Sequence, residues 1–393
     1  MELFRNTNFD FLGKKWPFII ASLVLTGGGL ASTAAKGGIK YGIDFRGGVD
    51  MSVKFSQRPS VDNLRKALAA KIPGEITVTE ELGGTQVIIS TELKSEKELD
   101  TARKTMADTL AASFGTASGK LDFHNAGQQA VVDRLRDPIQ RAGLPMNDAL
   151  LREMVKGMMA VRDGNPNFGI LKSLDQLGNV DGMTPQTLAI VKQELDLAPF
   201  AIRNVDLVGP KIGAELRNQA VLATLYALAG MLVFIAFRFE WIYGVAAVIA
   251  VFHDTIITLG LFSLFDKEVS LTVIAALLTL VGYSMNDTIV VFDRIRENLK
   301  LMRREKFEPL VNTSVNQTLS RTVLTSGLTL LTALALLLFG GQVLNGFSFA
   351  LVVGIIVGTY SSVFIASPIL IFWKNWMEKR GGGGTGKPVA VSK

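Results

Sequence analysis

The stretch Val269–Phe292, with the sequence VSLTVIAALLTLVGYSMNDTIVVF, decides the fold of this chain. It is apolar almost throughout and carries one charged residue, Asp287. The hydrocarbon core of a bilayer is about 30 Å thick, and a helix needs roughly 20 mainly apolar residues to cross it. The stretch meets that requirement, so we predict that it spans a membrane as an α-helix.

Five other segments meet the same requirement, although the average composition of the chain, 48% hydrophobic, is that of an ordinary soluble protein. The six predicted transmembrane helices, numbered 1 to 6 in chain order, cover residues 16–35, 219–237, 242–265, 269–292, 322–340 and 346–372. Lys14 and Lys15 before the first span, and the small residues Ala31–Ala35 at its end, resemble a cleaved signal peptide. The apolar run is longer than a signal peptide requires, which favours a permanent anchor. The chain is therefore predicted to be a six-helix membrane bundle.

The distribution of charge predicts the topology of the bundle. Lysine and arginine collect in the N-terminal segment 1–15, the connection 293–321 and the tail 373–393, whereas the loop at 340–346 has no charge. Such residues mark the cytoplasmic side, so both termini are predicted to be cytoplasmic. Basic and acidic residues balance within 36–215, so the whole net charge of +6 lies outside that range. We predict that 36–215 is an exported domain.

The exported domain shows the pattern of an α+β fold. Val49–Phe55 alternates apolar and polar residues, as a half-buried strand does. A helix capped by Ser60, two strands joined through Gly83-Gly84, a second helix and a closing strand at Ala201–Val208 follow. The order β-α-β-β-α-β is that of the split βαβ, ferredoxin-like plan. The stretch 118–198 interrupts this plan and is predicted to be a mainly helical insert.

Several chemistries are excluded by what the sequence lacks. The chain has no cysteine and only two histidines, so no metal site and no catalytic constellation is expected. His124 has no partner residues at meaningful spacing and is predicted to lie at the surface. The tail Gly381–Lys387 resembles a phosphate-binding loop, but Pro388 replaces the required Ser/Thr and no strand precedes it. We therefore predict a flexible tail, no bound cofactor, and energy drawn from an ion gradient or a partner.

The basic connection 293–321 is predicted to begin with an amphipathic helix, because Ile295, Leu299 and Met302 recur at helical spacing. Two interpretations stand side by side: a helix at the lipid surface or against a partner, and a simple positive-inside anchor. Nucleic-acid binding is disfavoured because no aromatic residues alternate with the charges.

Five polar residues in or beside the predicted spans are candidates for a proton relay, because ionisable groups inside a membrane are costly and commonly functional. They are His253, Asp254, Asn286, Asp287 and Arg321. A buried carboxylate that an arginine can approach and leave is able to bind and release a proton. Alternatives remain open: a static ion pair for Asp287, a snorkelling anchor for Arg321, and a packing pair for His253-Asp254. Small residues at Gly327, Gly354 and Gly358 predict close helix contacts.

Longer motifs connect these features to a known family. Tyr41-Gly42-Ile43-Asp44-Phe45-Arg46-Gly47-Gly48 resembles the signature shared by SecD and SecF, and Val208–Leu216 is similar to the second mark of that family. Gly282–Asn298, Asn316–Thr322 and Phe9–Lys14 resemble the SecF versions of the fourth span, the start of the fifth span and the N-terminal start. The resemblance covers nearly the whole chain apart from about 118–198 and the tail. The chain is thus similar to SecF proteins.

This resemblance implies a non-enzymatic subunit of the bacterial inner membrane, with a half-unit of the fold of resistance-nodulation-division exporters. It implies SecD as partner, association with the SecYEG channel and often the YidC insertase, unfolded preprotein as substrate, and the proton gradient as energy source. In the family, a fourth-span aspartate and a fifth-span arginine are implicated in proton movement, and they match Asp287 and Arg321. The insert departs from a typical SecF, so the way this domain meets its substrate does not carry over.

Two other classes of function stay open at this point. A small-molecule exporter of the resistance-nodulation-division type is expected to have twelve spans, and six argue for a half-unit, although a homodimer would supply the rest. A purely structural subunit would stabilise the translocation channel and leave proton movement to SecD.

Overall fold

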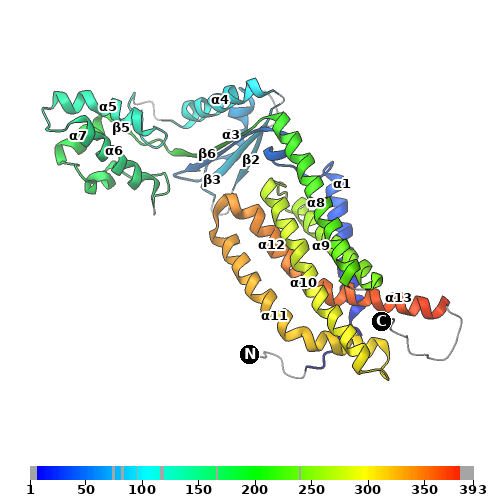
Figure 1. The fold of residues 1–393 in the computed structure, drawn as a ribbon. Helices are drawn as coiled ribbons and strands as arrows, with labels where there is room; N and C mark the ends of the chain where they lie inside the picture. Colours follow the sequence, from blue (N-terminus) through cyan, green and yellow to red (C-terminus); the bar gives the residue numbers. More distant parts are fainter. Residues whose placement is uncertain are drawn as a thin grey trace. The chain divides into compact units, whose positions relative to one another are not determined.

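The computed structural model describes residues 7–72, 76–80, 84–93, 95–115, 119–164, 167–238 and 240–380 (Figure 1). It divides into two compact units: a helical unit, up to Gly42 and from Leu216 onward, and a sheet unit, Ile43–Glu215. The predicted turn at Gly83-Gly84 is described only at Gly84, and the tail that resembles a phosphate-binding loop lies outside the described residues.

The sheet unit confirms the predicted ferredoxin-like order. Its four-stranded sheet has the order β2-β3-β1-β6, and every neighbouring pair is antiparallel. Residues at alternate positions of β1 are buried in one core with residues of α3 and α4. The elements are the short helix α2 (Ile43–Arg46), β1 (Gly48–Phe55), α3 (Val61–Ala69), β2 (Ile76–Glu80), β3 (Gln86–Glu92), α4 (Glu96–Phe114) and β6 (Phe200–Val208).

The insert has a hydrophobic core of its own, separate from the core of the sheet. Three amphipathic helices supply most of it, and a short parallel pair, β4 with β5, closes the segment. Asn147 and Thr184 begin two of the helices by accepting hydrogen bonds from backbone N–H groups, as N-cap residues do. The elements are β4 (Leu121–Asp122), α5 (Gln128–Arg141), α6 (Asp148–Asp163), the 3-10 helix η1 (Leu174–Asn179), α7 (Pro185–Glu194) and β5 (Leu195–Asp196).

The helical unit contains the six helices that are long and apolar enough to cross a membrane among the described residues. Four run further than the hydropathy predicted: α8 and α11 begin earlier, at Pro210 and Phe307, α10 continues past Phe292, and the last helix continues past Phe372. The reason in α10 is that Ile295 is fully buried in the bundle core, with Leu299 packed against it. The elements are α1 (Lys15–Ala35), α8 (Pro210–Arg238), α9 (Trp241–Leu264), α10 (Leu271–Leu301), α11 (Phe307–Phe339), α12 (Gly341–Ser361), the π-helical turn η2 (Ser362–Ala366) and α13 (Ser367–Arg380).

Glycine sets how closely some of these helices approach. A Cβ built on Gly29 of α1 would lie 2.6 Å from the Cα of Gly260 on α9, so the two backbones touch. Gly354 and Gly358 of α12 similarly face Leu280 and Ser284 of α10. Gly327 has no atom within 4 Å of such a Cβ, so the predicted close contact is wrong at this position and right at the other two.

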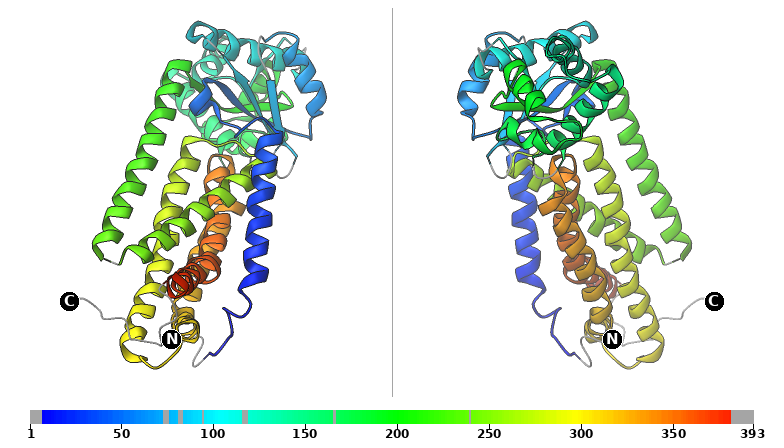
Figure 2. Two further views of the ribbon diagram at one scale, coloured as in Figure 1. Left: turned by 90° about the vertical axis from the view of Figure 1, so that its right-hand side faces the viewer. Right: turned by 90° about the vertical axis from the view of Figure 1, so that its left-hand side faces the viewer.

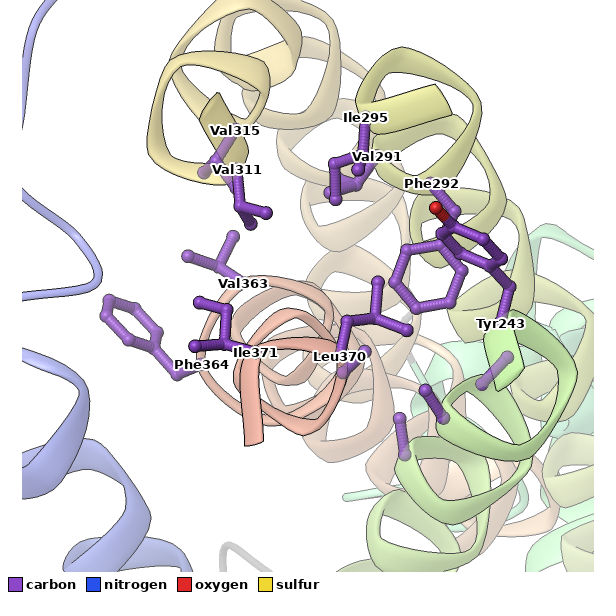
Figure 3. Close-up of a cluster of buried hydrophobic side chains, with 14 of the residues drawn as sticks. Tyr243, Val291, Phe292, Ile295, Val311, Val315, Val363, Phe364, Leu370 and Ile371 are labelled. Atoms are coloured by element: carbon purple, nitrogen blue, oxygen red, sulfur yellow. The ribbon is translucent and has the colours of Figure 1, made fainter. Parts of the chain in front are cut away.

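A large hydrophobic cluster, which includes Leu12, lies at the end of the bundle where α1 begins (Figure 3). Side chains of α9, α10, α11, η2 and α13 meet there, with Tyr243 and Phe292 edge to face at 5.4 Å between ring centroids. Helix α13 turns across this end of the bundle (Figures 1 and 2). Its Trp373 contacts Trp241 at 4.8 Å and Trp376 at 5.2 Å between centroids. Aromatic residues gathered at one level are typical of a membrane–water interface.

Candidate functional site

Asp287 is buried inside the bundle. It lies on α10 with only 3% of its surface exposed, and its Oδ2 accepts a hydrogen bond of 2.9 Å from the Oγ of Ser326 on α11. One neutral hydroxyl is modest compensation for taking a carboxylate out of water. Such a group is able to change its protonation state when its surroundings change.

The two other candidates of this region lie elsewhere on the same helices. Asn286 is exposed, because consecutive helical residues point about 100° apart. Arg321 is exposed too, at the start of the apolar part of α11, although it is near enough to act electrostatically on Asp287. Of the residues that the structure describes, none forms an ion pair with Arg321. The structure therefore shows Asp287 held by Ser326, with the arginine nearby and unpaired.

A second carboxylate, Asp254, is more deeply buried and has more partners. It is 0% exposed on α9, and its Oδ2 accepts hydrogen bonds from the Oγ atoms of Ser284 on α10 at 2.6 Å and of Ser361 on α12 at 2.8 Å. Its Oδ1 lies 2.8 Å from the Nδ1 of His253. One carboxylate thus joins three helices. Ser284 lies three residues before Asp287 on α10, so the contact that Asp254 makes with α10 is within one turn of Asp287.

The sequence did not identify the hydroxyl groups that hold these carboxylates. Ser284 stands one helical turn from Asp287, which is a weak signal, but Ser326 and Ser361 belong to other helices and have no such spacing. Ser361 immediately precedes the π-helical turn η2, and the hydroxyl of Ser367, directly after that turn, donates to the carbonyl of Ser362. π-Helical turns occur frequently at functional sites.

His124 is not at the surface, as predicted, but buried with 5% of its surface exposed. Its Nε2 accepts a hydrogen bond of 2.9 Å from the backbone N–H of Leu171, so its Nδ1 carries the hydrogen and donates to the carbonyl of Ala198 at 2.6 Å. Burial lowers the pKa of the imidazole from its usual value of 6.5. The neutral ring is a structural bridge, and its partners are backbone groups, which no spacing of side chains could predict.

The signature glycines are explained by geometry inside the sheet unit. Gly47 has φ +78°, and a Cβ there would lie 2.6 Å from the Cα of Pro210. Gly48 has φ +149°, and its Cβ would lie 2.1 Å from the carbonyl oxygen of Thr91. Gly213 approaches the backbone of Gly47 in the same way. Within the sheet unit, residues 45–47 and 209–213, far apart in the sequence, are therefore packed backbone to backbone.

The remaining signature residues are arranged around this contact. Gly42 donates its N–H to the carbonyl of Val269 at 3.0 Å, within the helical unit. Asp44, Phe45 and Arg46 belong to the short helix α2, where Phe45 is buried and Arg46 lies 3.7 Å from Glu92.

Comparison with known proteins agrees with the sequence and the fold. Residues 190–376 match the family model described as protein export membrane protein SecD/SecF, C-terminal. The chain is 48% identical over 394 residues to the protein translocase subunit SecF of Koribacter versatilis, a match that covers 97% of this chain and 95% of that protein. It is 35% identical over 383 residues to the SecF subunit of Calditerrivibrio nitroreducens, with 97% and 99% covered.

A fused relative and its crystal structure give the same result. The protein translocase subunit SecDF of Thermus thermophilus is 46% identical over 285 residues, which cover 70% of this chain and 37% of that protein. The crystal structure of SecDF, a translocon-associated membrane protein, superimposes with a TM-score of 0.65 and 33% identity, covering 94% of this chain and 39% of that chain. The chain thus spans well under half of the fused protein.

The fold and the site together define a class: a multi-pass membrane transport subunit, with six membrane helices, buried carboxylates in the bundle and a separate α+β unit. Within this class, identity over nearly its whole length decides the family. The chain belongs to the SecF family of protein translocase subunits.

Proposed function

We propose that this chain acts with a SecD protein to assist the export of unfolded preproteins across the bacterial inner membrane, driven by the proton gradient. The observation that carries the proposal is the buried carboxylate of Asp287 in a chain of the SecF family, with one hydroxyl partner and the arginine Arg321 nearby. The SecYEG channel and the YidC insertase are further proposed partners, through the family resemblance alone.

The SecD partnership is supported by the fused relative. SecDF of Thermus thermophilus contains, in one chain, a region similar to this chain and a remainder that does not align with it. A separate SecD would supply that remainder. Asn286 and Arg321 are exposed on the helical unit, and polar groups in membrane helices face the interior of a bundle or a water-filled cavity. A second subunit over this face would give both residues such surroundings.

The topology follows from the charges. With both termini in the cytoplasm, the sheet unit lies on the outer side, where a preprotein emerges. The end of the bundle with α13 and the clustered tryptophans is then at the cytoplasmic interface. Lys379 and Arg380, at the end of α13, are on the side that the positive-inside rule requires.

The proposed proton step uses two arrangements of the same residues. In the arrangement observed, Asp287 is removed from water, which favours the neutral carboxylic acid, and the single hydroxyl of Ser326 offsets this only in part. When the guanidinium of Arg321 moves toward the carboxylate, the charged form is favoured and the proton leaves. Coupling to the sheet unit requires only a two-state element that proton binding and preprotein binding both bias.

The test replaces Asp287 in a strain that lacks the native subunit. Asp287→Asn keeps the size and the hydrogen bond to Ser326 but cannot exchange a proton, so the part of export that depends on the proton gradient should be lost. Asp293→Asn is the matched control, because it makes the same chemical change at an exposed position of the same helix. Preprotein processing is measured with and without an uncoupler. Gradient-dependent export that persists in Asp287→Asn would refute the proposal.

A second pair of variants separates proton movement from a purely structural role. Arg321→Ala removes the charge at an exposed position, so the chain should still assemble with SecD while gradient-dependent export falls. Arg321→Lys should keep part of the activity, since a cation remains. Normal export in Arg321→Ala, with the complex intact, would favour the structural interpretation.

A further inference from the structure

The site around Asp254 contains a feature that the Asp287 site does not have. His253, the neighbour of Asp254 on α9, has a side chain that is only 14% exposed, and its Nε2 is a buried atom without a hydrogen-bond partner among the described residues. Buried polar atoms are nearly always paired in folded proteins. An orphaned ring nitrogen beside a buried carboxylate therefore calls for a chemical explanation.

The contacts of Asp254 define how the pair would hold a proton. Its Oδ2 lies within hydrogen-bond distance of two serine hydroxyl groups, which both donate to it when the carboxylate is ionised. The Nδ1 of His253, 2.8 Å from Oδ1, must then carry a hydrogen and donate it. The Nε2 of the neutral imidazole then carries no hydrogen. It is able to bind a proton, and no described residue donates a hydrogen bond to it.

We propose that His253 and Asp254 form a second proton-binding site of the bundle, in which the Nε2 of His253 takes up the proton. In this step one proton adds to the lone pair of Nε2 and converts imidazole into imidazolium, while Asp254 stays ionised. The carboxylate fixes the ring and balances the new charge, as an aspartate does for the histidine of a catalytic triad. Ser284 and Ser361 hold the carboxylate in place.

Few other titratable groups lie on the helices packed around His253. On α12 there is Tyr360, whose ring meets the imidazole edge to face at 6.1 Å and whose hydroxyl bonds to Ser22 of α1 at 2.7 Å. Helix α10 has Tyr283 and Asp287 in its apolar part, and its charged residues from Asp293 onward are near its C-terminal end. Helix α13 has Lys374, Glu378, Lys379 and Arg380, and η2 has no titratable residue. Helix α1 has no titratable residue after Lys15. No described cation pairs with Asp254, so the charge that would balance the carboxylate is the imidazolium itself.

The position of the pair matches a role in transport. His253 is in the middle of α9, about 18 Å along the helix from Trp241 at 1.5 Å per residue. Asp254 bonds to α10 at Ser284, one turn from Asp287, and to α12 at the residue that precedes η2. Proton uptake here would alter bonds that join three helices. The proposal rests on the proposed function for the proton gradient, but its chemistry is testable independently.

The test uses the fact that the full chain has only two histidines. The chain is labelled with 15N-histidine and placed in lipid nanodiscs, and NMR reports which ring nitrogens carry hydrogen; His253→Gln assigns the two signals. At about pH 9 the ring of His253 should carry hydrogen on Nδ1 only, and at about pH 5 on both nitrogens. A ring that keeps its Nε2 bare at both pH values, or that carries hydrogen there at both, overturns the proposal.

Two matched variants locate the source of the response. Asp254→Asn should leave Nε2 bare over the same pH range, because the balancing charge is gone, whereas Asp287→Asn should leave the response unchanged. A response that survives in Asp254→Asn, or disappears in Asp287→Asn, also overturns the proposal. If Asp254→Asn does not fold, the pH dependence of the His253 signal in the unaltered chain still tests the proposal. Failure of the proposed function is a separate result, because it would appear in the export assay as export that does not depend on the proton gradient, and it would not change these spectra.

Discussion

Lowering the pH should open the helical insert, because its attachment depends on a neutral histidine. His124 accepts from Leu171 at Nε2 and donates to Ala198 at Nδ1, and both contacts are buried. A proton on Nε2 would place an N–H group against the N–H of Leu171. Burial lowers the pKa of the imidazole below 6.5 in the folded chain, so the opened form binds protons at a higher pH than the folded form does.

The sign and the size follow from this difference. Since the opened form binds more protons below its own pKa of about 6.5, the stabilisation is fully present above that pH and is lost as the pH falls below it. Each pH unit in that window costs about 1.4 kcal/mol, or about tenfold in the opening equilibrium, while the folded ring stays neutral. Lowering the pH from 7.5 to 5.5 should therefore destabilise the insert by up to about 1.4 kcal/mol, the value reached when the folded ring stays neutral throughout.

Thiol labelling provides the assay, because the chain contains no cysteine. Val155→Cys places a single thiol in the fully buried core of the insert, and its labelling rate, divided by the rate in denaturant at the same pH, gives the opening equilibrium. The control adds His124→Gln, which should open more readily at both pH values and lose most of the pH dependence. An opening equilibrium that is equal at the two pH values, or equally pH-dependent in the Gln variant, would refute this account of His124.

Two further predictions concern backbone contacts. Gly29→Leu should weaken the packing of α1 on Gly260 and lower the midpoint of thermal unfolding in detergent. Gly28→Leu on the same helix should leave the midpoint unchanged, because no atom lies within 4 Å of an added Cβ there. Equal midpoints for the two variants would contradict the contact. Gly48→Ala should destabilise the sheet unit by about 3 kcal/mol or more, because its Cβ would overlap the carbonyl of Thr91. Urea unfolding followed by circular dichroism measures this change. A decrease in the free energy of unfolding below about 1 kcal/mol would show that the strand moves to accommodate the methyl group.

The sequence predicted the features that depend on local pattern. Hydropathy found the spans, because an apolar run of this length has few other solutions, and the alternation in Val49–Phe55 found the central strand of the ferredoxin-like sheet. The resemblance identified the family. The helical spacing of Ile295, Leu299 and Met302 predicted a helix after Phe292, and α10 does continue to Leu301. The pattern did not show that Ile295 is buried in the bundle core, because that burial depends on tertiary packing.

The site was predicted in its carboxylates but not in its contacts. The sequence indicates the depth of each residue in the membrane, and by depth Asp287 was able to meet Arg321. The direction of each side chain depends on how the helices are rotated against one another, and in the structure it is Ser326 that bonds to Asp287. For His124 the partners are main-chain groups 47 and 74 residues away. Every residue has such groups, so no pattern of residue types could reveal them.

The clustered tryptophans of the helical unit have a spectroscopic consequence. All four tryptophans and all five tyrosines of the chain lie outside residues 43–215, which contain phenylalanine as their only aromatic side chain apart from His124. The absorbance and fluorescence of tryptophan and tyrosine therefore report the helical unit alone. The sheet unit contains no tryptophan or tyrosine. A single tryptophan introduced there would therefore report the unfolding of that unit, with the four tryptophans of the helical unit as the only background emission from this residue type.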